Sequence, residues 1–164
     1  MIVYLIRHGQ AHEQSDTGQD ADRTLTTQGL AQANAIARFL TQQGDNTPTS
    51  VLASPYQRTT QTATSIWDAL DLPHRSEDRL AAHRTVSDIL EVISQAQIQS
   101  QSQVPVLAVI SHNPIISRTV DVLTDGPSAQ QVQWMRPGQL IGLTIDQSNP
   151  LGSALPLVEY RLND

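Results

Sequence analysis

The sequence of 164 residues contains no cysteine and no lysine. Without cysteine the chain forms no disulfide and no thiolate metal site, and a reducing compartment is allowed. Without lysine, all ten positive side chains are arginines, which bind phosphate through a planar guanidinium. No apolar run is long enough to span a membrane, and the first residues lack the basic leader of a signal peptide. We therefore expect a soluble, cytoplasmic protein.

The charge balance and the length limit the classes of function further. The formal net charge of −6 disfavours general binding to nucleic acid or to an anionic membrane. Any site for an anion must therefore be a local cluster of arginine or histidine. The length favours a single domain over residues 1–164, and no repeat or linker divides the chain.

Apolar periodicity predicts an alternation of strands and helices. The order is strand, helix, strand, helix, helix, strand, helix, strand, strand, which implies an α/β fold of three layers, a mostly parallel central sheet with helices on both faces. Strands are expected at 2–6, 50–54, 104–110, 139–145 and 157–162. Helices are expected from Thr26 or Thr27 to near Gly44, at 56–70 with Pro55 in the first turn, at 86–93, and at 116–123 before Gly126 and Pro127. The Gln/Ser-rich stretch 95–103 is expected to be a frayed helix end or loop, residues 12–24 a loop, and Pro150 and Gly152 part of a turn.

The first predicted helix has one apolar face. Leu30, Ala33, Ala37 and Leu40 follow one another at helical spacing. Ile36 and Phe39 flank this face, and the helix is expected to stop near Gly44.

Three polar clusters follow three of the predicted strands. They are Arg7-His8-Gly9, Ser54-Pro55-Tyr56-Gln57-Arg58 and Ser111-His112-Asn113-Pro114. Ligands of open α/β sheets bind beyond the carboxyl ends of the strands, so the clusters can meet there. Two arginines, two histidines and the N–H groups of two helix N-termini fit a phosphate, whereas no Gly-rich cradle for a nucleotide is present.

Each of these residue types has a role in phosphoryl transfer. Arg7 and Arg58 can bind the phosphate oxygens, and a neutral His8 can attack phosphorus. Nearby positive charge should lower the pKa of His8, and its second ring nitrogen should donate a hydrogen bond that fixes the tautomer. His112 can bond a phosphate oxygen, and Asn113 is a further candidate for phosphate binding.

Taken together, the clusters resemble the histidine phosphatase superfamily, which has the phosphoglycerate mutase-like fold. The short chain, Arg23-Thr24-Leu25-Thr26 before Gly29, and Ser111-His112-Asn113-Pro114 are most similar to the SixA phosphohistidine phosphatase branch. The resemblance extends from Ile2 to about Leu143. It implies that His8 carries the phosphoryl group, that Arg7, Arg58 and His112 complete the pocket, and that Arg23 contacts the substrate.

The sequence departs from that superfamily in one respect. Many members have an acidic proton donor in the middle of the chain, and the sequence does not assign one here; the candidates are Glu77, Asp78, His83 and Asp88. A phosphoramidate nitrogen is more basic than an alkoxide oxygen and depends less on a dedicated acid. The substrate is therefore expected to be a phosphohistidine in a signalling or phosphotransfer protein, or a small phosphoramidate.

Two other functions stay open, and no cofactor is expected. The same fold could serve a phosphomonoesterase or mutase, or a module that binds a phosphorylated partner without turnover. Zinc is disfavoured, because the five histidines, among them His12, His74 and His83, show no metal-ligand spacing.

Overall fold

Five strands form a single sheet in the computed structural model, which describes residues 1–99, 104–125, 134–146 and 151–162. The order is β2-β3-β1-β4-β5. β1 pairs in parallel with β3, and β3 with β2, while β4 is antiparallel to both β1 and β5. Only β4 therefore runs against the others. The strands are β1 Ile2–Arg7, β2 Ser50–Ala53, β3 Val106–Ser111, β4 Gln139–Thr144 and β5 Leu155–Arg161.

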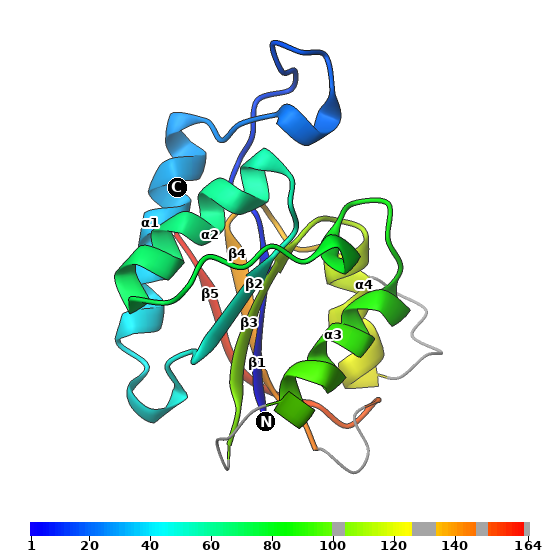
Figure 1. Ribbon diagram of the computed structural model, residues 1–164. Coiled ribbons are helices and arrows are strands. Elements are labelled where there is room, and N and C mark those ends of the chain that lie inside the picture. The colour runs from blue at the N-terminus through cyan, green and yellow to red at the C-terminus, as the bar shows by residue number, and fades with distance from the viewer. Residues whose placement is uncertain (100–103, 126–133, 147–150, 163–164) are drawn as a thin grey trace.

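Helices cover both faces of the sheet, as the sequence predicts. α1 (Thr27–Thr41) and α2 (Gln57–Leu70) lie on one face, and α3 (Val86–Gln99) and α4 (Ile115–Asp125) lie on the other (Figure 1). The alternation of side chains along β1 divides the core accordingly. Val3 and Leu5 pack with α3 and α4, whereas Tyr4 and Ile6 pack with α1 and α2. The three-layer α/β arrangement is thus confirmed.

Several predicted boundaries are wrong by a few residues. β3 begins at Val106 rather than at residue 104, because Pro105 has no N–H for the ladder and Val104 is exposed. α2 begins at Gln57, so Pro55 precedes the helix, and α3 continues to Gln99. β5 begins and ends earlier than 157–162, and α4 is longer than 116–123. Residues 100–103, Gly126, Pro127 and Pro150 lie outside the described residues.

Leu30 is the exposed member of the predicted apolar face of α1. Its side chain is 44% exposed, whereas Ala33, Ala37 and Leu40 are buried. The buried stripe of α1 includes the polar Gln32, whose Oε1 accepts a bond from the Gln10 N–H at 2.8 Å. The first part of this stripe thus contacts the loop after β1, whereas Ile36, Ala37 and Leu40 pack in the core against the sheet.

Two glycines allow α1 to lie against the loop after β1. A Cβ on Gly9 would come 2.5 Å from the carbonyl oxygen of Gly29, and a Cβ on Gly29 would overlap the carbonyl oxygen of Gln10. Thr26 caps the helix through its bond from the Gly29 N–H and also binds Gln10. The start of α1 is therefore fixed on the segment that follows His8.

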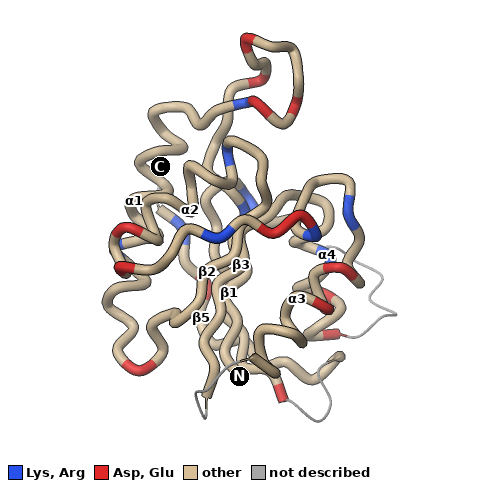
Figure 2. The backbone as a smooth tube through the Cα atoms, viewed as in Figure 1, with Lys and Arg blue, Asp and Glu red and all other residues tan. Residues whose placement is uncertain are grey.

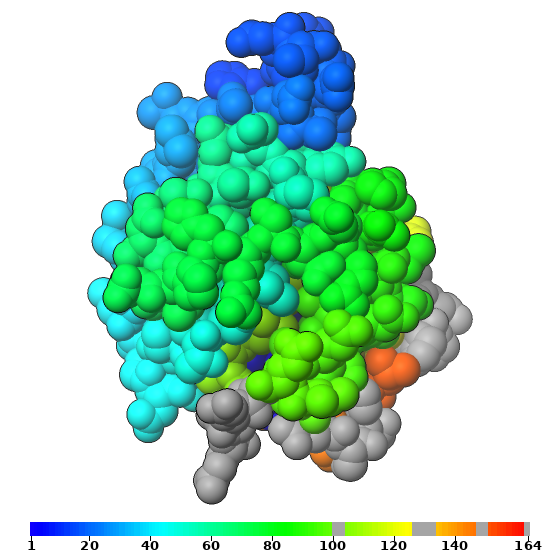
Figure 3. Space-filling model, viewed as in Figure 1, coloured from blue at the N-terminus to red at the C-terminus, as the bar shows by residue number. Residues whose placement is uncertain are grey.

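The surface view shows two further features (Figure 3). The loop between β1 and α1 projects as a dark blue lobe. A groove of about 740 Å³ lies between β2 and α3 and is lined by Met1, Ser50 and Pro105, at the ends of the strands opposite to His8. No helix in the described ranges is long and apolar enough to cross a membrane.

Candidate active site

The three predicted clusters meet at the carboxyl ends of adjacent parallel strands. His8 follows β1, Ser54 follows β2 and His112 follows β3. The His8 amide donates to the Ser111 carbonyl at 3.3 Å, and the Ser54 amide donates to the Ile110 carbonyl at 3.0 Å. These backbone bonds fix the spacing of the clusters. The ring centroids of His8 and His112 are 5.2 Å apart.

The tautomer of His8 follows from its two contacts. Nδ1 lies 2.7 Å from the carbonyl oxygen of Gly9, which can only accept, so Nδ1 carries the proton. Nε2 accepts a bond from Arg58 Nε at 3.2 Å. The lone pair that can attack phosphorus is therefore on Nε2, and it faces an arginine that can bind phosphate oxygens.

The surroundings of His8 keep its ring neutral. Burial lowers its pKa from 6.5 to about 4; the bond to Gly9 opposes this, and the charges of Arg58, Arg7 and Arg23 add to it. Close to neutral pH the ring is therefore unprotonated, as a nucleophile requires.

Arg58 lies in the first turn of α2 and is buried, with 4% exposure. Besides His8, its guanidinium binds Asp20 twice, donating to the backbone oxygen at 2.6 Å and to carboxylate Oδ2 at 3.0 Å. The Tyr56 ring lies 5.0 Å from its central carbon. These contacts hold a buried positive charge beside the nucleophile.

His112 offers a donor that no described residue accepts. Its Nε2 lies 2.7 Å from Ser54 Oγ, a hydroxyl that can donate its proton to Nε2. In that tautomer the proton of the neutral ring is on Nδ1, which is buried and has no partner in the described part of the chain. Burial, with the charges of His8, Arg58 and Arg7, lowers the pKa of His112 to about 2, although Asp20 opposes this. A ligand oxygen would satisfy this donor.

Arg7 and Asn113 share one anchor. Arg7 Nη1 and Asn113 Nδ2 both donate to the Met135 carbonyl, at 2.7 and 2.9 Å. Asn113 Oδ1 also accepts a bond from Ser117. Arg7 Nε is buried without a partner among the described residues. Arg7 thus retains a free donor, while the Asn113 amide holds the segment around Met135.

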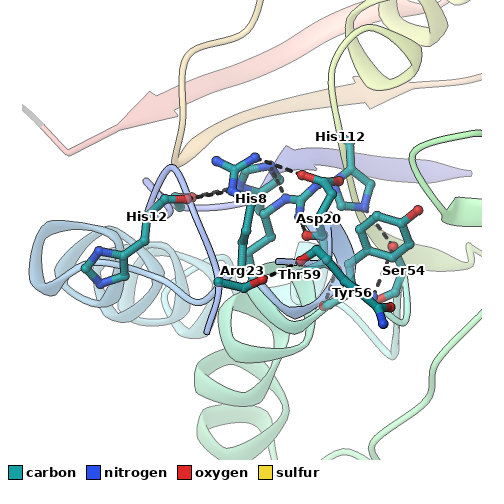
Figure 4. Close-up of polar contacts among 12 residues, drawn as sticks. His8, His12, Asp20, Arg23, Ser54, Tyr56, Thr59 and His112 are labelled. Carbon is teal, nitrogen blue, oxygen red and sulfur yellow. Dashed lines mark hydrogen bonds and ion pairs between the residues drawn. The ribbon is translucent and has the colours of Figure 1, made fainter. Parts of the chain in front are cut away.

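The projecting loop contributes an acid that the sequence reasoning did not single out. Asp20 lies in a short 3₁₀ helix (Asp20–Asp22) and binds both Arg58 and Arg23, the latter at 2.9 Å. Arg23 in turn donates from Nε to the His12 carbonyl (Figure 4). Figure 2 shows this loop as strongly acidic, with a basic position where it returns to α1. Arg23 therefore binds the loop directly. A carboxylate three residues before a motif arginine was the only sequence signal for Asp20.

Two of the four mid-chain candidates for a proton donor have other partners. Glu77 binds Arg79 through both oxygens, at 2.9 and 2.7 Å, and this bond lowers its pKa. Asp88 accepts bonds from the amide and hydroxyl of Thr85, which lower its pKa. Neither carboxylate holds a proton near neutral pH, so neither is suited to donate one.

The arrangement combines a neutral imidazole lone pair with donors that suit oxyanions. Arg7 Nε and His112 Nδ1 have no partner among the described residues, and Arg58 can exchange its bond to His8 for bonds to phosphate oxygens. Within the described ranges, no group of three or more His, Asp or Glu side chains is placed to hold a metal ion.

Comparisons with known proteins agree with this chemistry. A sequence model of the histidine phosphatase superfamily (branch 1) matches residues 3–83. The phosphohistidine phosphatase SixA of Escherichia coli (strain K12) is 30% identical over 148 residues, which cover 90% of this chain and 88% of that protein. The chain belongs to the histidine phosphatase superfamily, and this membership supports a phosphatase, a hydrolase of phosphorylated substrates.

Two solved structures superpose on nearly the whole chain. A structure of the protein histidine phosphatase SixA in complex with tungstate superposes with a TM-score of 0.79 at 26% identity, over 98% of this chain and 97% of that one. A mycobacterial glucosyl-3-phosphoglycerate phosphatase has a TM-score of 0.73 at 16% identity, over 96% and 97% of the two chains. The second likeness shows the shared fold alone.

Proposed function

We propose that the protein is a metal-independent phosphohistidine phosphatase that forms a covalent intermediate on Nε2 of His8. The observation that carries this is the His8 ring, with its proton bound to Gly9 and its lone pair beside Arg58. Arg7, Arg58 and His112 bind the phosphoryl oxygens in this account. Its substrate is a phosphohistidine in a signalling or phosphotransfer protein.

The first step moves the phosphoryl group from substrate nitrogen to His8. Nε2 attacks phosphorus as the substrate P–N bond breaks, and the bonding pair leaves with the imidazole of the substrate. Because Nδ1 keeps its proton, phospho-His8 is an imidazolium, and the Gly9 carbonyl 2.7 Å away stabilises its positive charge. The phosphoryl oxygens take the Arg58 N–H that Nε2 held before.

The state of the nearby carboxylates favours a P–N bond over a P–O bond. An alkoxide leaving group requires a proton, whereas an imidazole leaves neutral when its other nitrogen is protonated. Although burial acts against it, bonds from Arg23 and Arg58 lower the pKa of Asp20, so this carboxylate beside Arg58 is ionised. Asp20, Glu77 and Asp88 would therefore supply no proton to an ester leaving group.

A small-molecule phosphomonoesterase or mutase is the second candidate. It is favoured by the fold shared with the glucosyl-3-phosphoglycerate phosphatase. A module that binds a phosphorylated partner without turnover is the third candidate and is less well supported. The site keeps a nucleophile, His8, whose Nε2 lone pair accepts a bond from Arg58.

A substrate panel tests the proposal. Rates are compared for a phosphohistidine protein, p-nitrophenyl phosphate and phosphoglycerate, with the wild type, His8→Ala and the control His74→Ala, an exposed histidine paired with Asp68. Over phosphoglycerate we expect a preference for phosphohistidine of at least about 100-fold, because its alkoxide leaving group lacks an acid worth about that factor. p-Nitrophenolate leaves without a proton, so p-nitrophenyl phosphate reports the nucleophile and the phosphate pocket alone. We expect loss of activity on all three substrates only in His8→Ala. A preference for phosphoglycerate would refute the substrate, and full activity of His8→Ala would refute the mechanism.

A further inference from the structure

The second half of the reaction needs a group that the first half does not use. Water must hydrolyse phospho-His8, and it must lose a proton as it attacks. Inorganic phosphate then leaves the site. In phospho-His8 one ring nitrogen carries the phosphoryl group and the other keeps its proton at Gly9. His112 is buried and bonded to Ser54 through Nε2, so it lies away from the solvent that supplies the water.

The Asp20 carboxylate has the contacts that this task requires. Oδ2 bonds Arg58 Nη2 at 3.0 Å, and Nε of the same guanidinium bonds His8 Nε2 at 3.2 Å. One planar group therefore separates the carboxylate from the nucleophilic nitrogen. Figure 4 shows Asp20 reaching toward the His8 and His112 side chains from the loop.

Asp20 is also far more open to water than the arginine that it binds. Its side chain is 55% exposed, whereas that of Arg58 is 5% exposed. A water molecule that attacks in line approaches phosphorus from the side opposite to Nε2. A carboxylate at the edge of the buried site, held in its ionised form, can bind such a water.

We propose that the Asp20 carboxylate orients the water that hydrolyses phospho-His8 and takes its proton. The water oxygen forms a bond to phosphorus as the P–Nε2 bond breaks, and that electron pair returns to Nε2. One water proton passes to Asp20 and the other stays on the product, so the step yields hydrogen phosphate and neutral His8, with its proton still on Nδ1. This role rests on the proposed covalent mechanism.

Arg23 is a positioning residue in this scheme. Its guanidinium joins Asp20 Oδ1 at 2.9 Å to the His12 carbonyl at 2.6 Å, so it links the carboxylate to the base of the loop. Arg23 thus acts through Asp20, in addition to the charge that it contributes at His8. Its substitution should weaken the same step as a substitution of Asp20.

The same contacts allow a competing account that the experiment must separate. Asp20 occupies two bonds of Arg58, so it could act only as an internal anion that phosphate displaces. In that case its removal would strengthen phosphate binding and accelerate phosphorylation of His8, and hydrolysis of phospho-His8 would not change.

Single-turnover kinetics on the full chain distinguish these accounts. The protein is phosphorylated with ³²P-labelled phosphoramidate, the donor is removed, and the decay of label on His8 is followed after quenching in alkali. We expect Asp20→Asn to slow the decay by about 100-fold, the lower end for a positioned proton acceptor, while phosphorylation is not slowed. Asp22→Asn is the matched control; it removes the same charge from the same turn, and its carboxylate binds Thr17 instead. It should decay as the wild type does.

The remaining arms test Arg23 and separate the two proposals. Arg23→Gln should also slow the decay, and the double variant with Asp20→Asn should be no slower than Asp20→Asn alone. Wild-type decay in Asp20→Asn, with or without faster phosphorylation, would overturn the role of Asp20 and leave the covalent mechanism intact. Additive effects would overturn the role of Arg23. Failure of the wild type to acquire label on His8 would instead refute the proposed function.

Discussion

The pH dependence of phosphoryl transfer follows from the surroundings of the His8 ring. Its pKa is lowered to about 4, first by burial and then by Arg58, Arg7 and Arg23. At pH 5 a histidine with the ordinary pKa of 6.5 would be only about 3% neutral, whereas a ring with a pKa near 4 is about 90% neutral. The two cases differ by about 30-fold in the active form of the enzyme.

The assay is the pH profile of kcat/KM between pH 4.5 and 8. Phosphoramidate serves as the donor, its uncatalysed hydrolysis is subtracted, and its own ionisation is measured by ³¹P NMR. Nitrogen-15 NMR of the His8 ring gives the pKa directly. The pKa of His112 is near 2, so that ring does not titrate in this window. An acidic limb with a midpoint near 6.5, matched by the NMR titration of His8, would refute the reasoning.

The same pKa makes a prediction about stability. The unfolded chain binds a proton at His8 below pH 6.5, and the folded chain does so only below about pH 4. The contribution of His8 to stability is therefore complete above pH 6.5 and is lost as the pH falls toward 4, by about 3 kcal/mol. Urea unfolding of His8→Gln should show a weaker fall over this window. Identical pH dependence in the two proteins would contradict the pKa.

Three other outcomes are expected. Gly29→Ala should lower the free energy of unfolding by about 1–3 kcal/mol, because the added Cβ would overlap the Gln10 carbonyl. The control Asn34→Ala, on the exposed side of α1, should leave it unchanged. Urea denaturation measures both variants, and equal stability of the two would contradict the packing of α1 on the loop. Arg58→Lys keeps the charge and loses the planar guanidinium, so kcat/KM should fall by about 100- to 1,000-fold. The control Arg38→Lys, on the surface of α1, should leave kcat/KM unchanged. A change of less than tenfold in Arg58→Lys would show that the guanidinium geometry is unimportant. Prolonged dialysis against a chelator should leave the rate unchanged, and a loss of activity restored by a divalent cation would refute metal independence.

The sequence predicted the layers of the fold and the meeting of the three clusters. Both depend on features that are local in the chain, namely apolar periodicity and a polar cluster after each strand. Parallel pairing of β1, β2 and β3 then brings the strand ends together whatever the length of the connections. The prediction that a second ring nitrogen of His8 donates a hydrogen bond is confirmed in the contact to Gly9.

What the sequence did not predict depends on contacts between distant segments. The burial of Gln32 in place of Leu30 follows from the loop that packs against α1, and no helical period contains that information. Asp20 stands in a polar loop among other acids, and only its bonds to Arg58 and Arg23 distinguish it. The partner of a charged side chain is a property of tertiary structure, so sequence spacing could not identify it.

The central claim is that Nε2 of His8 carries the phosphoryl group during turnover. The most direct test is to mix the wild-type protein with a ³²P-phosphohistidine protein, to quench in alkali within the first turnover, and to locate the label by mass spectrometry. The account predicts label on Nε2 of His8, stable in alkali and labile in acid, and no label in His8→Ala. Rapid release of phosphate by the wild type with no labelled His8 at any time would contradict it.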